Sequence, residues 1–317
     1  MQSNNKPLIV LVGATAVGKT ALSLRLASHI NAEIISADSR LVYRGMDIGT
    51  AKPSPQELSL IPHHLIDIIE PDEPWSLADF QKTAYYAIQS IHKKHKIPLL
   101  VGGTGQYIKA ILEQWDLPKQ PPNPTLRNYL LQWSNQIPAW QFHHYLKLLD
   151  PIAAQTIDPS NKRRVIRALE VIFQSGRKFS EQRKKSLPQY QFLIIGLHRP
   201  RPELYQRIDF RINEMIAHGF VEEVQGLLAK GYSPDLPSMS AIGYREMVLF
   251  IKGRTTLDET VRLMQRATRN FVRRQANWFK LEDPAIKWFT LNTQAEAAIE
   301  NQILNTINQF LNETISS

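Results

Sequence analysis

The 317-residue sequence predicts an α/β fold, in which a parallel sheet is flanked by helices and interrupted by a helical insertion. Three observations lead to this fold class. Short apolar runs are typical of buried strands, and amphipathic segments with helical periodicity separate most of them. Between the fourth and the fifth run lie some 90 residues, more than a simple crossover needs, and after a proline-rich hinge they show only helical patterns.

The predicted strands are short apolar runs that end at turn-forming residues. The first, Pro7–Val12, ends at a glycine-rich loop. The others are expected at residues 33–36, 64–69, 97–101 and 190–196. Apolar residues on one face predict a helix over 21–30, and Ser76 followed by Asp79 is the capping signal of a helix over 76–94.

The predicted insertion covers residues 119–187, and its helical patterns follow a proline-rich hinge at 117–124. Its helical patterns lie at residues 125–136, 140–150 and 161–174. We therefore expect a core domain of residues 1–118 and 188–317 around a helical domain of 119–187. From Arg201 onward we expect mostly helix, with a polar tail after about Asn292.

The net charge of +9 is concentrated in the insertion. Residues 119–187 contain 12 Lys and Arg against 4 Asp and Glu, whereas residues 1–118 contain 11 of each and residues 188–317 contain 15 against 14. Clustered cations favour a polyanionic partner, because neutralising phosphates releases counterions. The alternative is a solvated basic surface that has no partner.

A second group of cations lies near the end of the chain. Arg262, Arg266, Arg269 and Arg273 are spaced by 4, 3 and 4 residues, which places them on one face of a helix. Met264, Phe271 and Trp278 fall on the opposite face, where they could pack. Four Arg without alternating acids favour phosphate contacts over surface ion pairs.

Composition excludes several classes of protein. With no cysteine, the chain has no disulfide, thiol nucleophile or Cys-based zinc site, and its nine His show no metal-ligand spacing. No apolar run approaches the roughly 20 residues of a membrane span, and the start lacks an apolar signal core. We expect a cytoplasmic protein without a membrane partner, and a monomer.

A Walker A motif follows the first strand and opens the first helix. It consists of Gly13, Ala14, Thr15, Ala16, Val17, Gly18, Lys19 and Thr20. Backbone N–H groups of such a loop and the positive end of the helix dipole bind phosphate oxygens. Lys19 would reach the terminal phosphates, and the Thr20 hydroxyl would bind Mg²⁺. The motif predicts a P-loop NTPase-like sheet and a ligand with a diphosphate or a triphosphate, without specifying the reaction.

Two further strands end in polar residues. Asp38 follows the second strand, and Thr104 lies in the glycine-rich segment 102–105 after the fourth. Because the carboxyl ends of parallel strands face a common crevice, both residues are candidates to lie near the phosphates. Asp38 could orient or deprotonate a nucleophile, or it could simply cap a loop. The glycines could admit a ligand or form a tight turn.

Taken together, these segments resemble the tRNA dimethylallyltransferases, also called tRNA isopentenyltransferases or the IPP transferase family. The matching stretches are GATAVGKT at 13–20, SADSRLVYRGMDIGTAKP at 36–53, HHLIDI at 63–68, VGGTGQYIKA at 101–110, RRVIRALEV at 163–171, SAIGYRE at 240–246 and RNFVRRQANWFK at 269–280. They cover most of the chain in order, and the second stretch is long and specific. The chain departs from the usual family pattern at Leu41, Gln106 and Lys162.

The resemblance implies transfer of a dimethylallyl group from dimethylallyl diphosphate to tRNA. The acceptor is the exocyclic amine of the adenosine immediately 3′ of the anticodon. Residues 13–20 with Mg²⁺ would hold the diphosphate. By the same resemblance Asp38 is the general base, Thr104 lies beside the reacting atoms and Arg207 assists the diphosphate.

The resemblance also implies a set of tRNA-contacting residues, many of them for the anticodon stem-loop. They are Asp38, Ser39, Arg40, Leu41, Thr104, Arg127, Ser160, Asn161, Lys162, Arg163, Arg164, Ser240, Ala241, Ile242, Gly243, Tyr244, Arg245, Arg273, Arg274, Gln275, Ala276, Asn277, Trp278, Phe279 and Lys280. The target base must leave the stack of the anticodon loop before it can react.

Three other functions use part of these features. A small-molecule P-loop kinase would use Asp38 to activate a hydroxyl, and a prenyltransferase acting on free adenine nucleotides would share the core chemistry. Both leave the basic insertion unexplained. A non-catalytic nucleotide-dependent RNA-binding protein would have no need for Asp38 and Thr104 at one crevice.

Overall fold

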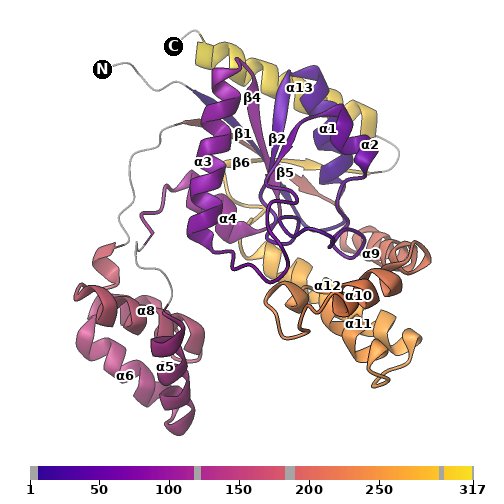
Figure 1. Ribbon diagram of the computed structural model, residues 1–317. Coiled ribbons are helices and arrows are strands. Elements are labelled where there is room, and N and C mark those ends of the chain that lie inside the picture. Colours follow the sequence, from indigo (N-terminus) through magenta and orange to yellow (C-terminus); the bar gives the residue numbers. More distant parts are fainter. Residues whose placement is uncertain (1–5, 118–122, 183–189, 293–295, 316–317) are drawn as a thin grey trace. The chain divides into compact units, whose positions relative to one another are not determined.

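The computed structural model describes residues 6–117, 123–182, 190–292 and 296–315 (Figure 1). The chain forms two compact units: Met1–Leu112 with Pro188–Ser317, here called the core unit, and Glu113–Leu187, here called the helical unit. No helix among the described residues is long and apolar enough to span a membrane.

The core unit is built on a parallel sheet with the strand order β3-β2-β4-β1-β5-β6. The strands are β1 (Pro7–Gly13), β2 (Ala32–Ser36), β3 (His63–His64), β4 (Ile97–Gly102), β5 (Gln191–His198) and β6 (Ile286–Thr290). All pairs are parallel, and the register places Val12 beside Gly102 and Gly13 beside Leu197. This confirms the predicted parallel sheet and brings the carboxyl ends of β1 and β4 together.

Helices cover both faces of the sheet, which explains the continuous apolar sequence of β1. Ile9 and Leu11 pack into one apolar cluster, and Leu8, Val10 and Val12 into another. On one side of the sheet lie α3 (Leu77–Lys93) and α4 (Gly105–Leu112); on the other lie α1 (Lys19–His29) and α13 (Glu296–Ile315) (Figure 1). The Ser76 capping box at the start of α3 forms as predicted.

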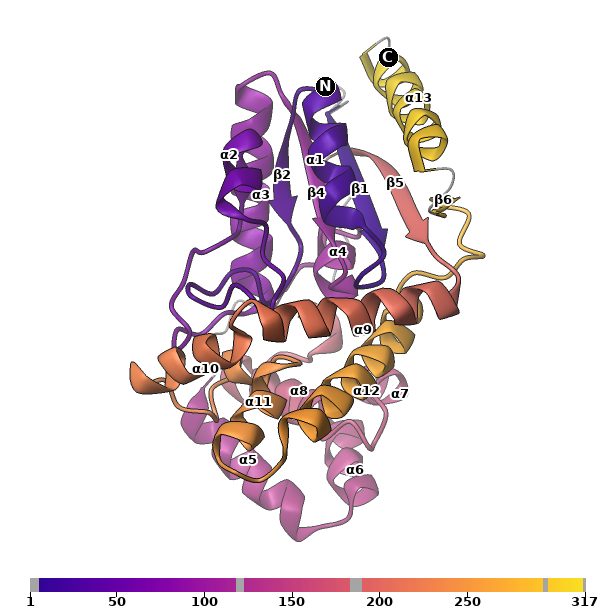
Figure 2. The same ribbon diagram turned by 90° about the vertical axis from the view of Figure 1, so that its right-hand side faces the viewer.

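A group of helices packs at the carboxyl ends of the strands. It consists of α9 (Arg201–Ala217), α10 (Phe220–Ala229), α11 (Tyr244–Ile251) and α12 (Leu257–Ala276), while the short α2 (Pro55–Leu60) precedes β3. Figure 2 shows α9 running across the strand ends, with α12 crossing beside it. These helices therefore form one side of whatever site lies at the strand ends.

Two sequence predictions for the core unit are wrong. The strand expected over 64–69 is only His63–His64, because Leu65 and Asp67 adopt left-handed φ angles of 65° and 53° that end an extended strand. The tail after Asn292 is not merely polar: α13 buries Ile299, Ile303 and Ile307, which are spaced by four residues. Strand β6 was also missed.

The helical unit contains α5 (Pro124–Gln136), α6 (Ala139–Leu149), α7 (Pro151–Thr156) and α8 (Lys162–Ser175). Its own apolar cluster includes Leu130, Phe142 and Leu169. Asn161 caps the start of α8, and Gly176, with a φ of 66°, ends it. Helices α5, α6 and α8 lie where the sequence predicts them, and α7 is additional. The predicted hinge falls largely on residues 118–122, which lie outside the described residues.

A buried carboxylate joins β2, β3 and the end of α3. Glu33 is 1% exposed and accepts hydrogen bonds from His64 Nε2 at 2.8 Å, Lys94 Nζ at 3.0 Å and Lys96 Nζ at 3.1 Å. Burial raises the pKa of Glu33, but these hydrogen bonds outweigh it and bring the pKa down to about 2. The charged form therefore stabilises the fold above the unfolded-state pKa of 4.5, and this stability is lost as the pH falls toward 2.

We expect Glu33→Gln to lower the free energy of unfolding by about 2–3 kcal/mol at pH 7, since one pKa unit corresponds to about 1.4 kcal/mol. The difference from wild type should shrink as the pH falls from 4.5 toward 2. Urea unfolding at several pH values measures it, with the exposed Glu282→Gln as the control. A difference that stays constant with pH would contradict the role assigned to the Glu33 charge.

Candidate active site

A cleft of about 810 Å³ lies in the core unit where β1, β2 and β4 end. It is lined by Thr15, Ala16, Gly18, Lys19, Thr20, Asp38, Leu41, residues 50–53, Val101 and Gly102, and by Gln206, Arg207, Phe210, Arg211 and Glu214 of α9. The Walker A segment and Asp38, which are separate in the sequence, thus share one cleft.

The Walker A segment forms the loop between β1 and α1. Gly18 is the N-cap of α1 with a φ of 114°, and no side chain caps this helix. The first N–H groups of a helix have no partner within the helix, and they carry the positive end of its dipole. An anionic group such as a phosphate fits this end of α1.

The carbonyl groups of the loop are bound by cationic side chains. Lys19 Nζ donates to Gly13 O at 2.9 Å and Ala14 O at 2.8 Å, and Arg207 Nε donates to Ala16 O at 2.9 Å. Arg199 Nε donates to Val17 O at 2.9 Å, while its guanidinium also pairs with Glu203 and Glu296. Ala16 adopts a left-handed φ of 62°, which is strained for a residue with a Cβ. The peptide dipoles of the loop are therefore fixed before a ligand binds.

Lys19 has an unusual acidity. Burial lowers its pKa from 10.5 to about 8, with Asp38 acting to raise it and Arg211 to lower it. Near pH 8 the ammonium group therefore gains or loses its proton readily, and an anionic ligand beside it would favour the charged form.

We expect pyrophosphate binding to be coupled to proton uptake by Lys19. As the pH rises above the lowered pKa of Lys19, about 8, the free protein loses the ammonium charge, so the affinity should fall by up to about tenfold per pH unit. Calorimetry between pH 7 and 9.5 in buffers of different ionisation enthalpy measures both effects. Lys19→Arg, which stays charged, should lack this proton uptake; identical pH profiles for the two proteins would refute the assignment.

Asp38 and Thr104 lie at the ends of neighbouring strands and are tied together through the backbone. Asp38 lines the cleft, and its Oδ1 accepts a hydrogen bond from Arg40 N at 2.8 Å. Thr104 N donates to Ala37 O at 3.3 Å, and Thr104 Oγ1 accepts from Ser39 N at 3.3 Å. Thr104 therefore holds the residues on both sides of Asp38.

Three glycines between the end of β4 and the start of α4 each leave space for a different neighbour. A Cβ at Gly102 would lie 2.3 Å from Ala37 O, one at Gly103 2.3 Å from Gln275 Nε2, and one at Gly105 2.2 Å from Trp278 Cγ. Contacts this short do not occur for real Cβ atoms, so the segment from β4 to α4 packs closely against the residue after β2 and against the end of α12 and the segment that follows it.

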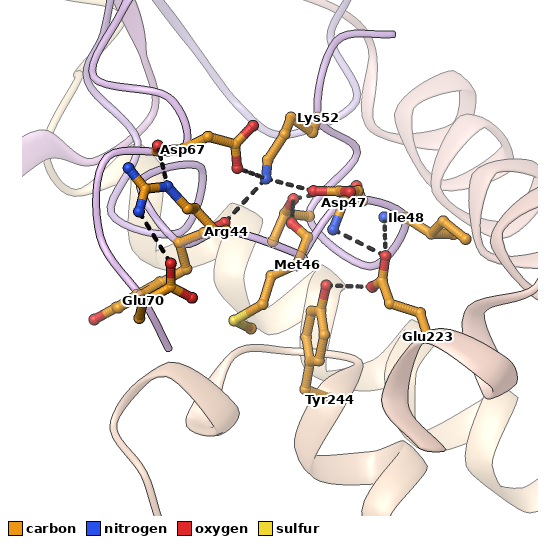
Figure 3. Close-up of polar contacts among 11 residues, drawn as sticks. Arg44, Met46, Asp47, Ile48, Lys52, Asp67, Glu70, Glu223 and Tyr244 are labelled. Atoms are coloured by element: carbon orange, nitrogen blue, oxygen red, sulfur yellow. Dashed lines mark hydrogen bonds and ion pairs between the residues drawn. The ribbon is translucent and has the colours of Figure 1, made fainter. Parts of the chain in front are cut away.

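A polar network around the buried Lys52 shapes the segment that leads from Asp38 to Pro53. Figure 3 shows Lys52 between Asp67 and Asp47, and its Nζ donates to both carboxylates as well as to Tyr43 O at 2.9 Å. Glu223 of α10 accepts hydrogen bonds from the backbone N–H groups of Asp47, Ile48 and Gly49 at 2.9, 2.7 and 3.2 Å. This network positions residues 50–53 at the wall of the cleft.

Tyr244 completes the network from α11. Its hydroxyl donates to Glu223 at 2.5 Å, and burial together with the Glu223 charge raises the pKa of Tyr244 (Figure 3). Tyr244 thus remains a hydrogen-bond donor at neutral pH. The sequence placed Tyr244 among RNA contacts; the structure places its side chain inside the core unit.

Other residues expected to contact RNA fall into two groups. In the core unit the side chains of Ala241, Gln275 and Phe279 are buried, whereas Ser240, Arg245, Arg273, Arg274, Asn277 and Lys280 are exposed. Arg40 brings two of the predicted stretches together, since its guanidinium donates to Pro237 O at 2.7 Å and to Ser240 Oγ at 3.2 Å.

In the helical unit the predicted residues also differ in surroundings. Ser160, Asn161 and Arg163 are exposed. Lys162 Nζ binds Ser134 O at 3.0 Å and Asn135 Oδ1 at 3.2 Å, at the end of α5. Arg127 pairs with the buried Glu170 at 2.7 Å. Lys162 and Arg127 therefore also hold the helical unit together.

The Arg stripe on α12 is only partly free. Arg262, Arg266 and Arg273 are exposed, but Arg269 pairs with Asp209 of α9 at 2.6 Å and lies 5.2 Å from the centre of the Tyr205 ring. The expectation that the Arg face lacks ion pairs is therefore wrong for Arg269, because its partner lies on another helix.

The sequence did not identify Arg211, Lys52 or Glu223. Arg211 lines the cleft, and its Nη1 lies 3.5 Å from Thr15 Oγ1. Its position four residues after Arg207, on the same face of a helix, is a signal that could have revealed it. Lys52 lies within the stretch SADSRLVYRGMDIGTAKP, but Glu223 carries no local signal.

Comparison with known proteins identifies the family. The model of the IPP transferase family matches residues 41–282, and the model of the isopentenyl transferases matches residues 6–67. The chain belongs to the IPP transferase family. This confirms the resemblance noted in the sequence and an enzyme that transfers a prenyl group.

Relatives within the IPP transferase family are close. The tRNA dimethylallyltransferase of Dehalococcoides mccartyi is 45% identical over 96% of this chain and 93% of its own, and that of a Roseiflexus species is 52% identical over 86% and 90%. The crystal structure of the tRNA isopentenylpyrophosphate transferase of Bacillus halodurans matches with a TM-score of 0.72 at 38% identity, covering 98% of both chains. A eukaryotic dimethylallyltransferase acting on tRNA matches with a TM-score of 0.82 at 28% identity, covering 97% of this chain and 80% of its own. These matches confirm the P-loop NTPase-like fold.

Proposed function

We propose that this protein transfers a dimethylallyl group from dimethylallyl diphosphate to the exocyclic amine of the adenosine immediately 3′ of the anticodon in tRNA. The C–O bond of the donor breaks, an N–C bond forms, diphosphate leaves and the amine loses a proton to Asp38. One observation carries the proposal: the phosphate-binding loop and Asp38 line the same cleft. Relatives named above are tRNA dimethylallyltransferases, and one solved structure is of a dimethylallyltransferase acting on tRNA, which supports this choice.

The cations at the cleft suit a diphosphate leaving group. An adenine amine is a weak nucleophile, so stabilising the charge on the departing oxygens contributes most to the rate. Lys19 and the N-terminus of α1 lie at the loop, and Arg207 and Arg211 of α9 line the cleft beside it. We include Arg211, which the sequence did not identify, among these cations because it lines the cleft as Arg207 does.

Mg²⁺ fits the chemistry of the loop, with Thr20 as its protein ligand. Thr20 lines the cleft, and no cluster of three or more His, Asp or Glu that could hold a metal occurs in residues 6–117, 123–182, 190–292 and 296–315. Mg²⁺ commonly takes few protein ligands together with substrate phosphates and water, so a single hydroxyl suits it. When bound, the ion would neutralise charge on the diphosphate.

The acceptor adenine would enter the cleft unstacked from the anticodon loop. We propose that the exposed cations of α12, the stretches 38–41 and 240–245, and the basic helical unit contact the tRNA. The charge of residues 119–187 supports this role. We further propose that the protein acts as a cytoplasmic monomer.

Charge reversal at Arg163 and Arg164 should weaken tRNA binding by about tenfold or more and reduce its salt dependence, because two phosphate contacts are lost. Fluorescence anisotropy with an anticodon stem-loop at 50–300 mM salt measures both. Pyrophosphate affinity should stay unchanged, since the two Arg lie in the helical unit. An unaltered salt dependence would show that this basic surface has no RNA partner.

The proposed function is tested by incubating the protein with unmodified tRNA, labelled dimethylallyl diphosphate and Mg²⁺. Label should appear in tRNA at the adenosine 3′ of the anticodon. In a parallel reaction with free AMP, label on AMP and none on tRNA would favour the nucleotide prenyltransferase. In a reaction with ATP and a small alcohol, phosphorylation of the alcohol without prenyl transfer would favour a kinase.

A further inference from the structure

A glutamine near the end of α12 connects the phosphate-binding loop with the turn after β4. Gln275 is 4% exposed, and its Oε1 accepts a hydrogen bond from Thr15 N in the phosphate-binding loop at 2.9 Å. Its Nε2 donates to Gly103 O in the turn after β4 at 3.0 Å. Both ends of the side-chain amide are therefore used inside the protein.

The surroundings fix the orientation of this amide. Thr15 N can only donate and Gly103 O can only accept, so the bridging group must present one acceptor and one donor. Gly103 leaves the space that Gln275 needs, because a Cβ there would lie 2.3 Å from Nε2. Three residues further along the chain, Trp278 packs against Gly105, the first residue of α4.

The two segments that Gln275 connects carry different parts of the proposed chemistry. Thr15 belongs to the loop that holds Lys19, whereas the turn containing Gly103 leads to Thr104, which holds the backbone on both sides of Asp38. A change in the spacing of these segments would change the distance between the leaving group and the base.

We propose that Gln275 is a positioning residue, which sets the phosphate-binding loop and the turn after β4 at a fixed separation, and that it does not contact RNA. This inference rests on the proposed function for its effect on the rate. Its effect on pyrophosphate affinity does not depend on which group the enzyme transfers. A misplacement of about 1 Å in an active site can lower a rate by about 100-fold.

The first test is Gln275→Met, which keeps the length of the side chain but removes both hydrogen bonds. We expect pyrophosphate affinity to fall by about tenfold, as expected for losing hydrogen bonds at a buried site. The value of kcat at saturating donor and tRNA should fall further, while the Kd for an anticodon stem-loop stays within about twofold. Asn270→Met, at an exposed amide of α12, is the control for pyrophosphate binding.

The second test is Gln275→Glu. A neutral carboxylic acid has one donor and one acceptor, as the amide does, but a carboxylate has no donor. Pyrophosphate affinity relative to wild type should therefore recover as the pH falls from 8 to 5, and a general packing defect would not produce this recovery. The thermal midpoint of each variant shows whether it is folded.

Two outcomes would overturn the inference. One is a Gln275→Met protein that loses stem-loop affinity but keeps pyrophosphate affinity, as an RNA contact would. The other is a Gln275→Glu protein whose pyrophosphate affinity relative to wild type is independent of pH. Failure of the proposed function appears separately, as a wild-type protein that binds pyrophosphate but transfers no prenyl group to tRNA.

Discussion

Asp38→Asn should lower kcat by about 10²–10⁴-fold, the usual contribution of a general base, and leave tRNA affinity within about twofold. The amide keeps the size of the side chain and an oxygen for Arg40 N, but it cannot take the proton from the adenine amine. Single-turnover transfer to an anticodon stem-loop, with tRNA and donor saturating, measures the chemical step.

Asp72→Asn, at an exposed carboxylate, is the control for the loss of one negative charge. If Asp38→Asn lost stem-loop affinity and retained the single-turnover rate, Asp38 would be a recognition residue and another group would accept the proton. Pyrophosphate affinity should not fall in this variant, because Asp38 repels the same anion that Lys19 attracts.

Lys19→Met should lower kcat/KM by about 10²–10³-fold, in the range seen when one group that stabilises developing charge is removed. Lys19→Met should also lower the affinity for pyrophosphate, whereas Asp38→Asn should not. Lys19 belongs to the Walker A loop, and its ammonium donates to Gly13 O and Ala14 O beside the N-terminus of α1. Calorimetry with pyrophosphate and the single-turnover rate measure the two effects.

Lys19→Met also removes two hydrogen bonds from the loop, so its thermal midpoint must be measured beside the binding data. Unchanged pyrophosphate affinity in a folded Lys19→Met protein would show that α1 and the α9 guanidiniums hold the anion without it. That result would contradict the role given to the Walker A lysine.

Much of the fold follows from local sequence. Three features depend only on neighbouring residues and were therefore predictable. They are the strand before the Walker A loop, the capping box at Ser76 and the end of α8 at Gly176. The short length of β3 was not predictable, because Leu65, whose left-handed conformation ends the strand, is not a glycine. Strand β6 was missed as an isolated segment of five residues in a region that otherwise indicates helices.

The candidate site was predictable where a motif carries it. Residues 13–20 and Asp38 are recognised by their place after a strand. The resemblance placed Gln275 among the tRNA contacts, but its hydrogen bonds to Thr15 and Gly103 could not be predicted, since these partners are 260 and 172 residues away. Arg269 shows the same limit: its ion pair with Asp209 spans 60 residues, which helical spacing alone does not reveal.

The order of the strands has a consequence for how the chain folds during synthesis. β1 is complete after Gly13, but its neighbour β5 begins only at Gln191, once the entire helical unit has been made. The entropic cost of closing a loop grows slowly with loop length. The helical unit therefore raises the free-energy cost of pairing β1 with β5 by less than about 1 kcal/mol. The larger effect is on timing: an apolar edge of β1 stays open until residues 191–198 leave the ribosome, and such an edge is prone to aggregation. The helical unit, whose apolar cluster is local, can complete its fold during that interval.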